Sequence, residues 1–78
     1  MHFVYFLKCS NNKVYTGCTN NLYDRIRRHK EGKIFYTSKH LPVELIGFMA
    51  IPDEKKAFRL EKYFKSGSGK AFVNKRIL

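Results

Sequence analysis

The stretch Val4-Tyr5-Phe6-Leu7-Lys8, followed after a short polar segment by Val14-Tyr15-Thr16-Gly17, decides the fold of this chain. Aromatic and β-branched residues alternate between two faces in both stretches, which is typical of β-strands. Ser10-Asn11-Asn12 between them is interpreted as a turn, because asparagine tolerates positive φ and its side chain bonds the local backbone. The sequence therefore predicts an antiparallel hairpin.

The strands of this hairpin are predicted at residues 3–9 and 13–17. Pairing centred on the turn brings Tyr5 and Tyr15 close to each other across the ladder. Gly17 is expected to end the second strand, since glycine permits unusual dihedral angles and the close approach of a neighbouring group. The two tyrosines are thus the first candidates for a site.

A helix is predicted directly after the hairpin, over residues 21–31. The polar residues before Leu22 offer several N-cap candidates, and Gly32 is a C-terminal stop. Arg25 and His29 are four residues apart and therefore project from one face of this helix. A cation and an imidazole would lie together on that face.

A third strand and a second helix complete the predicted architecture. Residues 33–41 are polar and basic and are expected to form a loop. Residues 43–51 have the mixed alternation of a strand with a buried face. A helix follows over 54–65, with Asp53 as its cap. The predicted fold class is α+β: a small three-stranded antiparallel sheet flanked by helices, in a single domain over 1–78.

Glu61 is the anomaly of the second helix. Ala57, Leu60 and Phe64 form an apolar stripe, and Glu61 occupies a position on that same stripe. A carboxylate on a core-facing stripe is costly unless it is paired or binds a metal. Two interpretations stay open: Glu61 pairs with Lys65 or an arginine at the edge of the stripe, or it holds a metal ion.

The charge balance favours a polyanionic partner. Sixteen Lys and Arg residues against six Asp and Glu residues give a net charge of +10 in 78 residues. Such a field attracts nucleic acid, because phosphate contacts provide most non-specific affinity; an anionic membrane surface is the less favoured alternative. No apolar run approaches the roughly 20 residues that span a bilayer, and no signal peptide is recognised. A cytoplasmic protein without membrane contact is expected.

Three other features receive structural interpretations. Ser66-Gly67-Ser68-Gly69-Lys70 lacks the first glycine and the final hydroxyl residue of a Walker A motif, and it is expected to be a flexible basic loop. Cys9 and Cys18 have no zinc-type spacing and no activating partner, so they are expected to be small semi-buried residues. His2 and His40 are predicted to lie on the surface.

The order and spacing of the candidate residues resemble the GIY-YIG nuclease family. The first motif of that family carries a tyrosine, and its second carries Tyr-x-Gly about ten residues later. An arginine, then a His or Tyr, and finally a glutamate on a later helix follow. The matching residues here are Tyr5, Tyr15-Thr16-Gly17, Arg25, His29 and Glu61.

The resemblance covers the whole chain, with three departures. The first motif, Val4-Tyr5-Phe6, lacks its usual glycine, Thr16 replaces an isoleucine, and Cys18 stands where some members have a lysine. The segment from Lys65 to Lys70 is in contrast similar to the tail of the compact single-domain members.

The resemblance implies a divalent-metal-dependent endonuclease that hydrolyses phosphodiester bonds in DNA. One Mg²⁺ or Mn²⁺ ion on Glu61 would act as a Lewis acid, and Arg25 would clamp the phosphate. A tyrosine would accept the proton of the attacking water; Tyr5 is favoured as this base and Tyr15 as the orienting residue, with the exchanged roles open. Because tyrosine titrates near ~10, the base needs cationic neighbours, among them Arg25 and His29.

Three functional hypotheses follow. The first is the DNA endonuclease, with RNA open as an alternative substrate. The second is a catalytically weak nucleic-acid-binding module, in which the tyrosines are ordinary cross-strand aromatics and His29 is a helix-end residue. The third is an accessory subunit that takes its specificity from a protein partner. The residues expected to contact nucleic acid are Arg27, Arg28, Lys65, Lys70 and Asn74.

Overall fold

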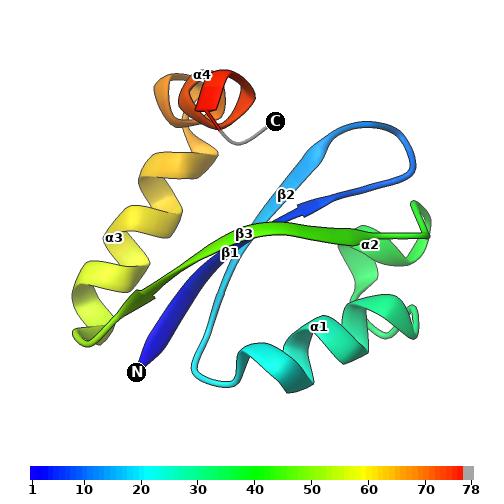
Figure 1. Ribbon diagram of the computed structural model, residues 1–78, viewed down its shortest axis with the longest axis horizontal. Helices are drawn as coiled ribbons and strands as arrows, with labels where there is room; N and C mark the ends of the chain where they lie inside the picture. Colours follow the sequence, from blue (N-terminus) through cyan, green and yellow to red (C-terminus); the bar gives the residue numbers. More distant parts are fainter. Residues whose placement is uncertain (77–78) are drawn as a thin grey trace.

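The computed structural model describes residues 1–76 and contains a three-stranded antiparallel sheet with helices on both faces (Figure 1). Strand β1 lies in the centre, between β2 and β3. The predicted α+β class and the three-stranded sheet are therefore confirmed; the last two residues of the predicted domain lie outside the described part. The elements are β1 His2–Lys8, β2 Val14–Thr19, α1 Leu22–Lys30, α2 Phe35–Ser38, β3 Glu44–Ile51, α3 Glu54–Lys65 and α4 Gly67–Arg76.

Strand β1 is buried on both faces, which explains its unbroken apolar sequence. Val4 and Phe6 belong to a core cluster with side chains of α3 and α4. Tyr5 and Leu7 point to the opposite face and belong to a second cluster, against which Ile26 of α1 packs. Figure 1 shows this division, with α3 and α4 on one side of the strands and α1 and α2 on the other.

The hairpin differs from the prediction at the end of β2. Asn12 in the turn has a φ of 65°, as its residue type led us to expect. The strand does not end at Gly17 but continues to Thr19. Gly17 is instead paired with Tyr5, and any side chain on Gly17 would overlap the phenol of Tyr5. The glycine therefore provides the space that this tyrosine occupies.

Helices α1 and α3 begin at predicted caps. The Asn21 side chain accepts a hydrogen bond from the N–H of Asp24 at 3.1 Å, and the Asp53 side chain accepts one from the N–H of Lys55 at 3.0 Å. Gly32, with a φ of 75°, follows the end of α1. Both predicted helices are confirmed, and their start positions fix which faces they turn towards the sheet.

Two segments that were predicted to be loops contain helices. Residues 33–41 include the single turn of α2. The segment 66–70 is the start of α4, where the Ser66 hydroxyl oxygen accepts a hydrogen bond from the N–H of Gly69 at 3.3 Å. Val73 of α4 is buried in the core. A Ser/Gly-rich sequence suggests a flexible loop. Here the burial of Val73 and the hydrogen bond to the Ser66 cap stabilise a helix instead.

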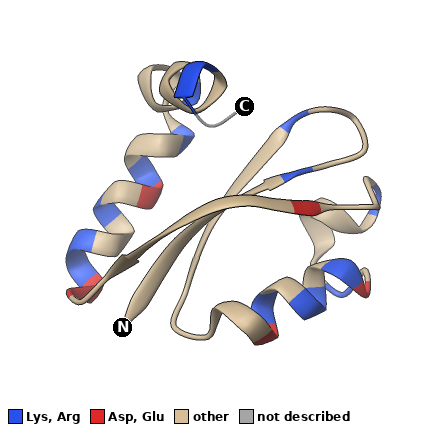
Figure 2. Cartoon of the chain, in the orientation of Figure 1, with Lys and Arg blue, Asp and Glu red and all other residues tan. Residues whose placement is uncertain are grey.

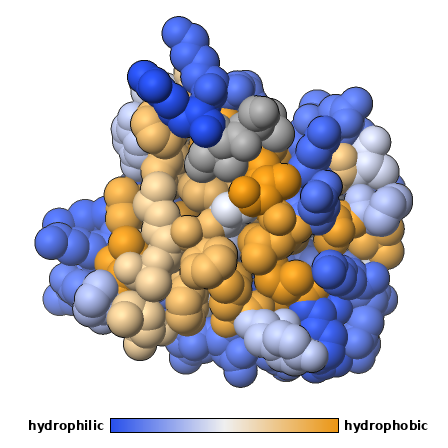
Figure 3. Space-filling view, viewed as in Figure 1, coloured by the Kyte–Doolittle hydropathy of each residue, from blue (hydrophilic) through white to orange (hydrophobic). Residues whose placement is uncertain are grey.

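The edge strand β3 is only partly covered. Figure 3 shows apolar side chains gathered over the middle of this face of the molecule, and Phe48 of β3 is 53% exposed. His2 and His40 are partly buried rather than on the surface, and Nε2 of His2 lies 3.1 Å from the carboxylate of Glu54. Within residues 1–76, no helix is both long and apolar enough to span a membrane.

We expect Gly69→Ala to destabilise the protein, because a methyl group there would overlap the backbone of Tyr63 and Phe64 where α4 packs on α3. The unfolding free energy in urea should fall by about 1–3 kcal/mol. The matched control is Gly67→Ala, where an added methyl group meets no atom within 4 Å and the helix gains a better helix former. Equal unfolding midpoints for the two variants would contradict the close packing of α3 and α4.

Candidate active site

Tyr5, His29 and Thr37 form a buried chain of hydrogen bonds on the α1 side of the sheet. The Tyr5 hydroxyl lies 2.8 Å from Nε2 of His29, and Oγ1 of Thr37 lies 2.7 Å from Nδ1. None of the three residues is more than 1% exposed. Strand β1, helix α1 and helix α2 each provide one member, so three separate elements must be in place to form the chain.

These hydrogen bonds assign the tautomer of His29. The Thr37 hydroxyl donates to the carbonyl oxygen of Ile34 at 3.4 Å, so it accepts the proton of Nδ1. Nε2 is then unprotonated and accepts a hydrogen bond from the Tyr5 hydroxyl. Burial, with a smaller effect of Arg25, lowers the pKa of His29 from 6.5 to about 4. In place of the cationic neighbour expected from the sequence, His29 is a neutral hydrogen-bond acceptor.

The environment of Tyr5 favours its protonated form. Burial is the main cause that raises the pKa of this phenol above its usual value, and the charges of Tyr15 and Glu61 act in the same direction. Arg25 opposes them. In the free protein Tyr5 therefore keeps its proton near pH 7 and donates it in the hydrogen bond to Nε2 of His29.

Tyr15 connects the buried chain to the surface. Its ring centroid lies 5.1 Å from that of His29 and 6.3 Å from that of Tyr5. Nζ of Lys65 lies 5.8 Å from the centre of the Tyr15 ring and 3.3 Å from the carboxylate of Glu61. Strand β2 lies at the edge of the sheet and has no strand on its outer side. Lys65 of α3, which packs on one face of the sheet, can therefore reach around this free edge to Tyr15 on the other face.

The arginines of α1 differ in their pairing. Arg27 forms ion pairs with Asp24 and Glu31, and Arg28 forms one with Asp24. Figure 2 shows the acidic segments beside the basic ones on this helix. Within residues 1–76, no carboxylate lies at ion-pair distance from Arg25. Arg25 is therefore the arginine of α1 whose charge is available to an anionic ligand.

Glu61 is the acidic residue of the site. Its side chain is 23% exposed and paired with Lys65, as one of the two interpretations from the sequence anticipated. Among the described residues, no group of three or more His, Cys, Asp or Glu side chains could hold a metal. A single accessible carboxylate nevertheless suits Mg²⁺, which commonly takes one or two carboxylates together with waters and substrate phosphate.

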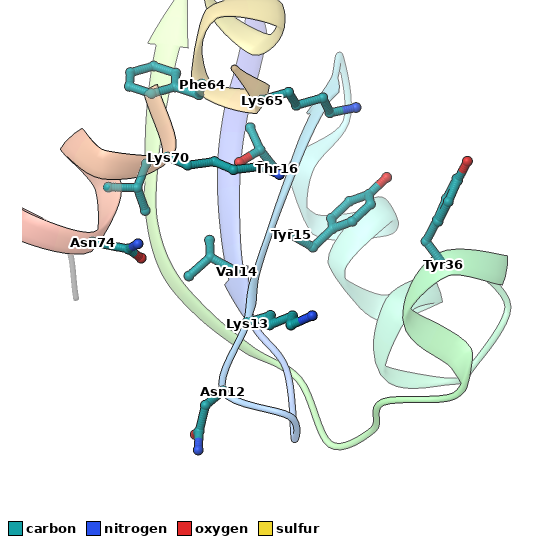
Figure 4. A pocket seen from close by; sticks show the side chains of 11 residues that line it. Asn12, Lys13, Val14, Tyr15, Thr16, Tyr36, Phe64, Lys65, Lys70 and Asn74 are labelled. Atoms are coloured by element: carbon teal, nitrogen blue, oxygen red, sulfur yellow. The ribbon is translucent and has the colours of Figure 1, made fainter. Parts of the chain in front are cut away.

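A groove of about 690 Å³ runs along the free edge of β2 (Figure 4). Residues of β2, α2, the end of α3 and α4 line it. Three of the five predicted nucleic-acid contacts belong to this lining, whereas Arg27 and Arg28 do not. The polar and aromatic lining residues are Asn12, Lys13, Tyr15, Thr16, Tyr36, Phe64, Lys65, Lys70 and Asn74.

Sequence reasoning missed Thr37, Tyr36 and Lys13. The first two lie in α2, which has no helical periodicity in the sequence because it is a single turn. The neighbouring aromatic residues Phe35 and Tyr36 within a basic segment could have indicated a role for Tyr36. The sequence contained no comparable indication for Thr37. Cys18, by contrast, is a partly buried free thiol as expected, and burial raises its pKa, so it remains a protonated packing residue.

Comparison with known proteins agrees with this geometry. A family model described as the GIY-YIG catalytic domain matches residues 1–76. The chain belongs to the GIY-YIG family. This GIY-YIG chain is 42% identical over 65 residues to the UPF0213 protein YazA of Bacillus subtilis, covering 82% of the chain and 66% of YazA. It is 41% identical over 66 residues to the UPF0213 protein CPE1444 of Clostridium perfringens, covering 83% and 71%.

A solved structure confirms the GIY-YIG fold. The solution NMR structure of the UPF0213 protein BH0048 from Bacillus halodurans matches with a TM-score of 0.62 and 34% identity, over 97% of this chain and 85% of that one. The GIY-YIG domain is a nuclease-type fold, which implies nucleic-acid binding. The names of the relatives state no activity, so the chemistry proposed below rests on the geometry of the site.

We expect Thr37→Val to destabilise the protein, because it removes the hydroxyl that accepts the Nδ1 proton of His29. A buried N–H without a partner costs roughly 1–3 kcal/mol, and urea unfolding should show a loss of this size. Thr37→Ser keeps the hydroxyl and should lose less. Equal losses for the two variants would mean that packing of the methyl group, rather than the hydrogen bond, holds His29.

Proposed function

We propose that this protein is a divalent-metal-dependent DNA endonuclease. The observation that carries the proposal is that the charges of Arg25 and Glu61 both act on the phenol of Tyr5, which is itself hydrogen-bonded to His29 at 2.8 Å. A module that only binds nucleic acid has no need of a buried proton acceptor beside an arginine and an accessible carboxylate. The residues assigned to catalysis are Tyr5, Tyr15, Arg25, His29 and Glu61.

The groove beside these residues suits a DNA strand. Lys13, Lys65 and Lys70 line it and would contact phosphates, while Asn74 would donate hydrogen bonds from its amide. Arg27 and Arg28 lie outside the groove and are already paired with acids. They would add to the long-range attraction of DNA rather than contact the phosphate that is cleaved.

Arg25 and Glu61 are assigned to two different tasks: Arg25 would bind the phosphate, and Glu61 would bind the metal ion. The guanidinium of Arg25 would hold the scissile phosphate through a planar pair of N–H donors. Lys65 pairs with Glu61 in the free protein and would move to a phosphate when DNA enters, which frees the carboxylate. Glu61 would then hold one Mg²⁺ or Mn²⁺ ion, which supplies a Lewis acid for the charge that develops on the leaving oxygen.

Tyr5 is assigned as the general base, acting together with His29. As the phenol oxygen of Tyr5 accepts a proton from the attacking water, its own proton passes to Nε2 of His29, so no free phenolate has to form. Thr37 holds the ring in the tautomer that can accept this proton. Tyr15, beside both rings, would orient the water or the phosphate.

Substrate binding would make His29 a stronger base. In the free protein, burial and the charge of Arg25 lower the pKa of His29. Once Arg25 is paired with a phosphate, its effect on the imidazole is offset by the negative charge of that group. The pKa of His29 would therefore rise when the scissile phosphate is in place, while the larger effect of burial remains, and proton transfer would be favoured by correct binding.

We expect labelled DNA to be cut in the presence of Mg²⁺ or Mn²⁺ and not in EDTA. Glu61→Ala should abolish cleavage and leave DNA binding largely intact, because it removes the proposed metal ligand and keeps every lysine and arginine that would contact DNA. Arg25→Ala should slow cleavage at least about 100-fold, the scale of losing one charge-stabilising group in a transition state. The assay compares single-stranded, duplex, flap and branched DNA, with RNA as the alternative substrate.

Two matched variants control this experiment. Glu54→Ala removes an acid at the far end of the same helix, and Arg28→Ala removes an arginine of α1 that is paired with Asp24; both should cleave nearly as well as the wild-type protein. Undiminished cleavage by Glu61→Ala would refute the metal assignment. Equal losses for Arg25→Ala and Arg28→Ala would refute the phosphate clamp. Tight binding with no cleavage under any condition would favour the binding module or the accessory subunit.

A further inference from the structure

Two large aromatic side chains of α2 stand exposed beside the groove. Phe35 is 74% and Tyr36 is 75% exposed, and their ring centroids lie 6.0 Å apart. They are not on a loose segment, because the next residue, Thr37, is buried and hydrogen-bonded to His29. Two aromatic rings that a fixed turn exposes to solvent do not stabilise the folded protein. Their exposure therefore indicates that they bind a ligand.

The two rings continue a path from the catalytic residues to the surface. The ring centroid of Tyr15 lies 5.1 Å from that of His29 and 6.4 Å from that of Tyr36. Figure 4 shows the rings of Tyr15 and Tyr36 facing each other across the groove, one from β2 and one from α2. Tyr15, Tyr36 and Phe35, here termed the aromatic track, therefore lead from His29 towards the exposed rings of α2.

Cations accompany the aromatic track. Nζ of Lys39 lies 5.4 Å from the centre of the Phe35 ring, Nζ of Lys65 lies 5.8 Å from that of Tyr15, and Lys13 lines the same groove as Tyr36. Rings interleaved with lysines match an unpaired strand, whose bases stack on the rings while its phosphates meet the cations. A duplex keeps its base faces within its own stack and cannot use such rings.

We propose that Phe35 and Tyr36 form a base-stacking platform for unpaired DNA nucleotides next to the scissile phosphate. The platform directs cleavage to strands or segments whose bases are free, such as overhangs and flaps. It rests on the proposed function for its role in substrate choice, but it is a binding site and takes no part in bond cleavage. Stacking accepts any base, so it would select strand structure rather than sequence.

A tryptophan reporter tests the platform without any cleavage. The chain contains no tryptophan, so Phe35→Trp introduces a single fluorophore that preserves stacking. Titration in EDTA with an oligothymidylate should quench its fluorescence to saturation, and a duplex of the same length should quench it little. The control is Tyr23→Trp on α1, at a residue 83% exposed, which should respond weakly to both. Equal quenching of the Phe35→Trp variant by single strand and duplex would overturn the proposal.

Affinity measurements complete the test. The double substitution Phe35→Ala with Tyr36→Ala should weaken binding of single-stranded DNA about tenfold or more, the scale of losing one stacked base, and change duplex binding less than about twofold. Tyr23→Ala should change neither. Equal losses on both DNAs, or no loss, would overturn the platform, as would a change in self-association with no change in DNA binding.

These outcomes separate the platform from the nuclease proposal. Stacking observed in EDTA with no cleavage under any metal condition would refute the nuclease and keep the platform as a single-strand binding site. Metal-dependent cleavage whose rates on single-stranded and on duplex DNA are both unchanged by the double substitution would keep the nuclease and refute the platform.

Discussion

The structure depends on one buried hydrogen bond, the 2.8 Å contact between the Tyr5 hydroxyl and Nε2 of His29. Two polar groups that are fully shielded from solvent must satisfy each other, since an unmade hydrogen bond there costs as much as several well-packed methylene groups. Three features of the surrounding structure allow this hydrogen bond to form. The central position of β1 buries Tyr5, the glycine of the Tyr-x-Gly motif leaves room for its ring, and the cap of α1 sets the register that turns His29 inwards.

The edge position of β2 explains how a site can form from both faces of one sheet. Tyr5, Tyr15 and His29 lie on the face covered by α1 and α2, whereas Glu61 comes from a helix on the other face. Around an interior strand these groups would be separated by the sheet. Around a free edge, Lys65 of α3 reaches from Glu61 to the ring of Tyr15, and the groove lies along the same edge.

Much of this arrangement was predictable because it is encoded by local rules. Alternation predicted the hairpin, capping residues predicted helices α1 and α3, and spacing placed Arg25 and His29 on one face. Helices α2 and α4 were not predictable, because a single turn has no periodicity and because burial of Val73 is a tertiary contact that a Ser/Gly-rich segment does not show. The neutral state of His29 was missed for the same reason: it follows from burial and from Thr37, which only the fold brings together. The pairing of Arg27 and Arg28 with Asp24 was not predicted, although their helical spacing of three and four residues would have allowed it.

The most direct test of this account is the protonation of the His29 ring, read from long-range ¹H–¹⁵N correlation NMR of the ¹⁵N-labelled protein. We expect the Nδ1-protonated neutral tautomer at pH 7, unchanged as the pH falls to about 5, since burial and Arg25 hold the pKa of this imidazole at about 4. An Nε2-protonated ring, or titration near the ordinary value of about 6.5, would contradict the chain from Tyr5 through His29 to Thr37 and with it the proposed path of the proton.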